Sequence, residues 1–159
     1  MDDLMISVIE GAIPKKEIDA LKGIIIFRDE DGTYNVYDKY LIRKNEDGIY
    51  EVTVNGTHTI KTFYKLKNAV AWCSFDKRNM FKASRRLHQL DQMIFSMDTE
   101  IQLHSKLMKK ATDSDYKLIY LSKLTQDKAK KKSFSSELNH FLDEYQRWQT
   151  SLFDTKPNY

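Results

Sequence analysis

The 159-residue chain has few of the residues that secreted proteins and nucleotide-binding enzymes depend on, with one cysteine, two prolines and five glycines. A single cysteine, Cys73, excludes a disulfide within one chain, which favours a cytoplasmic setting. Five glycines leave little for phosphate-holding loops, and neither a G-x-G-x-x-G nor a P-loop sequence occurs. The apolar run at 24–27 is far too short to cross a membrane. The acidic start at Asp2 and Asp3, with no long apolar run after it, predicts no signal peptide.

Residues that commonly carry chemistry are present but scattered. G-x-S-x-G is absent, and zinc-binding cysteine pairs cannot form. Glu137 and His140 match the Glu-x-x-His element of di-iron bundles, but such a site needs two copies and two more glutamates. We interpret this pair as a solvated helix face, and Cys73 beside Trp72 as a small buried hydrophobic residue. We therefore expect no catalytic residues, no metal and no cofactor, in a protein that is not an enzyme.

Charge is unevenly divided along the chain. Residues 1–60 hold 7 Lys and Arg against 12 Asp and Glu, a net of −5, whereas residues 61–159 hold 19 against 11, a net of +8. Within 61–89, Asp76 is the single acid among eight basic residues. Such a stretch indicates an anion-binding face, or a face that docks on an acidic partner, including the protein's own first half.

Alternating apolar and polar residues over 24–63, with turns at 29–32 and 45–48, predict an antiparallel meander of three or four strands. We expect a break near Asp38 and Lys39. Asn55-Gly56 is the strongest hairpin signal, because a type I′ turn needs positive φ at both central residues. A meander this small needs a helix across one face.

The segment before the strands is less clearly patterned. Residues 13–23 predict a short helix, with Pro14 at its first position and Gly23 at its stop. Residues 4–12 fit either a strand or a helix.

Apolar residues at alternating spacings of three and four predict a helix from about 65 to 110 with one apolar seam. Asp76 interrupts this seam and leaves open whether the helix is continuous there. His104 also falls on the seam, where we interpret it as a polar residue that sets the packing register. Glu100 lies one helical turn before His104 and can pair with it.

A second helix, from about 115 to 152, follows a turn at 111–115 that contains an N-cap candidate. A turn this short makes the two helices antiparallel. The polar block at 128–133 is expected to leave the core face or fray. The residues that predict this second helix are Leu118, Leu121, Leu124, Leu138, Leu142, Tyr145 and Leu152.

The sequence thus predicts an α+β protein, in which a small antiparallel β-meander packs on a helix and a long antiparallel helical hairpin follows. The first unit spans 1–64 and the hairpin 65–152, with its first turns on the sheet. Residues 153–159 form a tail.

Two sets of residues are candidates for binding. The basic set lies among aromatic residues, as in nucleic-acid-binding surfaces. The apolar set lies outside the seam of the first long helix, and such a surplus indicates another helix, subunit or protein. The basic set is Lys77, Arg78, Lys82, Arg85 and Arg86, and the apolar set is Phe81, Phe95, Leu103 and Leu107.

From these sets we expect a non-enzymatic protein–protein interaction or assembly protein that binds a protein partner or itself. The alternative is a nucleic-acid-binding accessory protein that uses the basic stretch 61–89. Neither a membrane nor a small-molecule substrate is expected as a partner.

Several stretches, at 40–44, 48–52, 63–73, 76–79 and 117–124, together resemble small uncharacterised proteins encoded by marine tailed phages. The similarity spans about residues 40–130. The resemblance implies a viral origin and a location in the host cytoplasm or the virion. It implies no activity and no functional residues.

Overall fold

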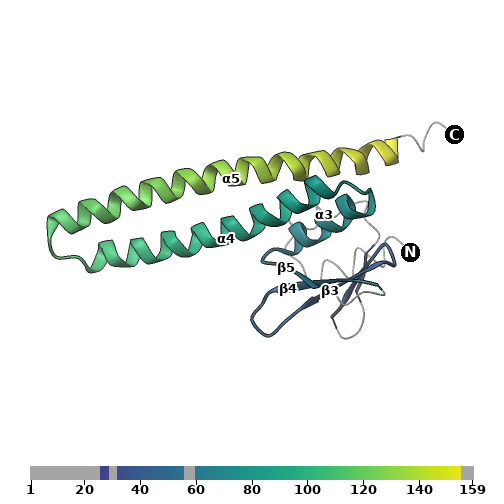
Figure 1. The fold of residues 1–159 in the computed structure, drawn as a ribbon, viewed down its shortest axis with the longest axis horizontal. Coiled ribbons are helices and arrows are strands. Elements are labelled where there is room, and N and C mark those ends of the chain that lie inside the picture. Colours follow the sequence, from purple (N-terminus) through teal and green to yellow (C-terminus); the bar gives the residue numbers. More distant parts are fainter. Residues whose placement is uncertain (1–25, 29–31, 56–59, 155–159) are drawn as a thin grey trace.

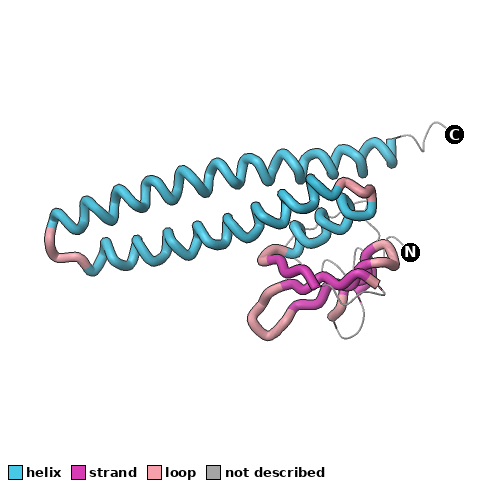
Figure 2. Tube along the Cα trace, viewed as in Figure 1, coloured by secondary structure: helices cyan, strands magenta, loops and turns pink. Residues whose placement is uncertain are grey.

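The computed structural model describes residues 26–28, 32–55 and 60–154. In these residues an antiparallel sheet packs on one side of a helical layer, and two long helices extend beyond it as a hairpin (Figure 1). Figure 2 shows the separation of strands from helices. The α+β class with a meander and helices is confirmed. The predicted helix at 13–23, the undecided residues 4–12 and Gly56 of the predicted hairpin turn lie outside the described residues.

The sheet has the simple order β1-β2-β3-β4-β5, with every neighbouring pair antiparallel. The sequence predicted three or four strands, and the structure pairs five. Alternation is clear in β3, where Tyr40 and Ile42 are buried and Leu41 between them is exposed. The strands are β1 (Ile26–Arg28), β2 (Tyr34–Val36), β3 (Tyr40–Lys44), β4 (Tyr50–Val54) and β5 (Ile60–Phe63).

The β2–β3 turn takes the left-handed backbone without glycine, because Tyr37 and Asp38 have φ of 57° and 56°. Aspartate tolerates this conformation, whereas tyrosine is strained in it. Tyr37 is held by the helical layer: its hydroxyl donates to Ser74 Oγ at 3.4 Å, and Lys77 Nζ lies 4.0 Å from its ring centroid. Tertiary contacts therefore support a turn that local sequence disfavours.

The first long helix, predicted as one element, is two helices: α3 (Leu66–Lys77) and α4 (Phe81–Lys110). Asn79 ends α3 in the left-handed conformation, with φ of 60°. The Met80 N–H then bonds the Phe75 carbonyl at 3.0 Å, which closes the end as a Schellman motif. The break lies three residues after Asp76, where continuity was in doubt.

Helix α3 covers the sheet with its buried face. Trp72 meets the ring of Tyr40 edge-on, with centroids 6.0 Å apart. Asp76 accepts a 2.6 Å hydrogen bond from the Tyr40 hydroxyl, and burial together with this carboxylate raises the pKa of Tyr40. Cys73 is fully buried, and burial raises the pKa of its thiol. Its interpretation as a small hydrophobic residue agrees with this burial.

Helix α5 (Ser114–Asp154) returns antiparallel along α4 after the predicted turn. Asp113 caps it, since its Oδ1 accepts the Asp115 N–H at 2.8 Å. The expectation of fraying at 128–133 is wrong, because the helix is continuous there. The other half of that expectation agrees with the structure, because the residues of this block are exposed apart from Lys131. Lys131 is half-buried and forms a 2.5 Å ion pair with Asp98 of α4.

The carboxylate of Asp91, on α4, lies at the junction of the sheet and the helices and is only 2% exposed. It accepts the Tyr64 N–H at 2.9 Å and the Asn68 side-chain amide at 2.8 Å. Gln92 Nε2 donates to it at 2.9 Å. The N-cap residue of α3, Lys65, makes no side-chain capping bond. The carboxylate of Asp91 on α4 instead accepts hydrogen bonds from donors at the start of α3.

Replacing this carboxylate should destabilise the protein strongly. D91A leaves a backbone N–H and a buried amide without their acceptor, so the free energy of unfolding should fall by about 2–4 kcal/mol. Urea denaturation measures the change. D98A is the matched control on the same helix, because its half-exposed ion pair with Lys131 contributes less than about 1 kcal/mol. Equal losses in the two variants would contradict the role of Asp91.

The same carboxylate predicts a pH dependence. Burial raises the pKa of Asp91 above its ordinary 3.8, and its hydrogen bonds only partly oppose this. The folded state therefore binds more protons than the unfolded state between 3.8 and the raised pKa. The difference in free energy of unfolding between wild type and D91A should shrink as pH rises through that window. A difference that grows with pH in parallel urea titrations would contradict this.

Candidate interaction surface

Three polar contacts tie α4 to α5 at successive levels of the hairpin. Nearest the sheet, the Arg86 guanidinium donates two hydrogen bonds to the Glu137 carboxylate, of 2.6 Å and 2.9 Å. The contact lowers the pKa of Glu137 and raises that of Arg86. The Asp98–Lys131 pair follows, and the Nδ1 of His104 lies 2.6 Å from Asp127 Oδ2 further out. The contacts meet α5 in the reverse order of α4, as antiparallel helices require, and together they fix the register.

The predicted basic set divides between two helices. Lys77 and Arg78 end α3, whereas the other three lie in the first turns of α4. Lys82 and Arg85 are exposed. Lys77 lies over the Tyr37 ring, and Arg86 is held by Glu137. Lys77 and Arg86 are therefore engaged within the chain. Nucleic-acid binding by this set stays a prediction.

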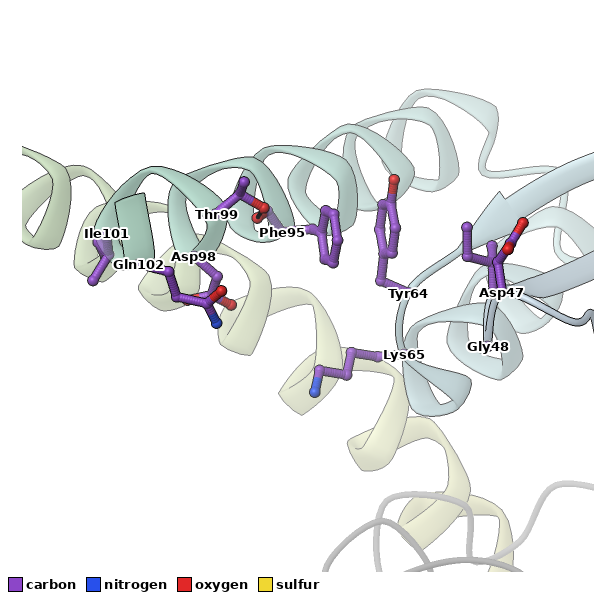
Figure 3. Close-up of a pocket in the computed structure, with 10 residues that line it drawn as sticks. Asp47, Gly48, Tyr64, Lys65, Phe95, Asp98, Thr99, Ile101 and Gln102 are labelled. Atoms are coloured by element: carbon purple, nitrogen blue, oxygen red, sulfur yellow. Dashed lines mark hydrogen bonds between the residues drawn. The ribbon is translucent and has the colours of Figure 1, made fainter. Parts of the chain in front are cut away.

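The predicted apolar set also divides. Phe95 stacks flat on Tyr64 with ring centroids 3.6 Å apart, so part of its ring faces the β-unit (Figure 3). These two rings line a groove of about 540 Å³ between the β3–β4 turn, α4 and the start of α3. Phe81 and Leu103 are exposed, and Leu107 is half-buried.

Among the described residues, most of the large exposed apolar side chains lie at the distal end of the hairpin, far from the sheet. Leu118 is the most exposed, at 64%. Leu118 lies one turn from Leu121, and Tyr116 lies one turn from Ile119. Residues one turn apart are neighbours on a helix surface, so each pair forms a joint apolar surface. We call this set the distal apolar cluster: Leu103, Tyr116, Leu118, Ile119 and Leu121.

Leu103 was predicted as part of an interaction face, whereas the α5 residues of this cluster were not. Leu118 and Leu121 were used only as markers of the second helix, yet both lie outside its buried side. Leu124, Leu138 and Leu142 make that side. The available signal was helical phase, because Leu118 does not continue the spacing of the buried leucines toward the N-terminus.

Comparison with family models, with curated proteins and with solved structures found no match for this chain. The resemblance to phage proteins therefore stays a prediction. None of the helices in the described part of the chain has the length and apolar content that crossing a bilayer requires.

Leu118 is exposed and Leu124 is buried on the same helix, so substituting them should affect the free energy of unfolding very differently. L124A should lower the free energy of unfolding by about 2–5 kcal/mol, since it opens a cavity against α4. L118Q should change it by less than about 0.5 kcal/mol, because a solvated side chain loses no packing. Thermal or urea unfolding tests both. Similar losses would show that the register of α5 is misassigned.

Proposed function

We propose that this protein is an assembly module that binds a second copy of itself through the helical hairpin. The distal apolar cluster carries the proposal. Large apolar side chains at the end of a two-helix arm lie beyond the reach of the protein's own sheet. They are 49–64% exposed, so burying the rest of each is favourable by about 1 kcal/mol. A second hairpin laid alongside would cover them and make a four-helix arrangement.

The charge layout of the hairpin supports a second copy as the occupant. The distal half, residues 101–132, has 9 Lys against 3 Asp, a net of +6. The proximal half, residues 81–100 and 133–154, has 4 Lys and Arg against 7 Asp and Glu, a net of −3. One hairpin therefore carries two halves of opposite sign.

Opposite halves favour an antiparallel pair. A two-fold axis near the middle of the arm places the basic distal half of one copy beside the acidic proximal half of the other. A tip-to-tip contact would instead bring two halves of +6 together. Electrostatic complementarity thus selects the side-by-side arrangement. In it, the distal apolar cluster of each copy packs against the proximal half of the other, where Phe81 is also exposed.

Sedimentation velocity tests the proposal. At about 100 μM the wild type should sediment as a dimer with a micromolar dissociation constant. L118S/I119S removes two members of the cluster without touching the buried side of α5, and it should shift the equilibrium to monomer. I60S is the matched control, because Ile60 is equally exposed but lies on β5.

A salt series separates the two arrangements. Raising NaCl from about 0.1 M to about 1 M shortens the Debye length from about 10 Å to about 3 Å. The antiparallel dimer should weaken, whereas a tip-to-tip dimer should tighten as its repulsion is screened. Tightening would overturn the arrangement. A monomer at every salt and protein concentration would overturn the proposed function.

A further inference from the structure

Glu100, His104 and Asp127 converge between α4 and α5. One ring nitrogen of His104, Nδ1, lies 2.6 Å from Asp127 Oδ2, and the other, Nε2, lies 3.6 Å from Glu100 Oε2. One ligand-type atom from each residue falls within 4.8 Å of the others. The sequence suggested only the Glu100–His104 pair, because Asp127 comes from the other helix and lies 23 residues further along the chain.

The three side chains have unequal access to solvent. Those of His104 and Asp127 are 13% and 12% exposed, whereas that of Glu100 is 45% exposed. The cluster is thus enclosed by the two helices on one side and open on the Glu100 side. An ion can enter from that side and keep water on the positions that the protein leaves free.

We propose that this cluster binds a divalent transition-metal ion of the Zn²⁺ type, as a clamp between α4 and α5. An imidazole nitrogen with two carboxylate oxygens is a ligand set that zinc accepts, with bonds of about 2.0–2.2 Å. Ligand atoms around a tetrahedral ion with such bonds lie about 3.3–3.6 Å apart. Because the two carboxylates face different nitrogens of the His104 ring, and the ligand-type atoms spread over 4.8 Å, the exposed Glu100 side chain must swing toward Nδ1 to complete the site. Calcium, which takes six to eight oxygen ligands, does not match an imidazole-containing set.

Binding replaces a proton with the ion. The hydrogen-bonded contact between His104 Nδ1 and Asp127 holds one proton. Coordination by this nitrogen releases that proton to solvent, while both carboxylates bind in the ionised form. The ion would also stabilise the folded chain, since the unfolded chain does not hold the three ligands together.

Isothermal titration of the full-length protein with ZnCl2 tests the site, with MgCl2 as the comparison ion. Wild type should bind one Zn²⁺ tighter than about 100 μM, weaker than a four-ligand structural site. H104A should weaken binding at least about 100-fold, beyond the loss typical of second-shell substitutions. H140A is the matched control, because His140 is an exposed histidine of the same hairpin and lies outside the cluster.

E100Q keeps the test informative if H104A fails to fold. Glu100 is the solvent-facing member, so E100Q should retain the wild-type circular dichroism spectrum and melting temperature without metal. It should also lose most of the zinc affinity and the zinc-induced rise in melting temperature. The proposal is overturned if wild type binds no zinc tighter than about 1 mM, the weak range of non-covalent affinity. It is also overturned if both E100Q and H104A bind as wild type does, or if H140A alone abolishes binding.

Discussion

The fold depends most on the carboxylate of Asp91, because one buried side chain connects three parts of the chain. It belongs to α4, accepts the backbone N–H of Tyr64 after β5, and accepts the amide of Asn68 in the first turn of α3. A buried carboxylate is costly unless donors surround it, and here the donors come from the segments that must be joined. The sheet and the base of the hairpin are therefore fixed together at one polar point.

Beyond this junction the hairpin has no sheet beneath it, and polar contacts take a larger part in the packing of its two helices. Buried leucines such as Leu87 and Leu90 lie near the sheet, at the level of the Arg86–Glu137 pair. Further out, the polar pairs 98–131 and 104–127 join the two helices. A purely apolar seam tolerates a slip by one helical turn more easily than directional hydrogen bonds do. The polar contacts therefore fix register where apolar packing is thinnest. They also leave the distal apolar residues outside the seam, available to a second molecule.

The sequence predicted best those elements that depend on a local residue pattern. The alternation in β3, the turn at 111–115 and the length of α5 were predicted, because strand and helix periods are properties of neighbouring residues. A break near Asp38 was expected, and continuity at Asp76 was left open. Because neither place has a glycine, the sequence did not identify Tyr37 and Asn79 as the residues that take the left-handed conformation. Phe95 could be selected as apolar and off the seam, but its stacking on Tyr64 depends on a residue 31 positions earlier.

By itself the sequence determined the class of fold, the order of its elements and the unequal charge of its parts. These follow from spacing and composition, which are fixed before the chain folds. Only the tertiary structure decided the partner of each polar side chain. Asp91, Asp127 and Glu137 are all acidic residues inside long helices, yet one caps a neighbouring helix, one meets a histidine and one holds an arginine. The cost of burying a charge is met by groups distant in sequence, so their identity is settled only when the helices pack.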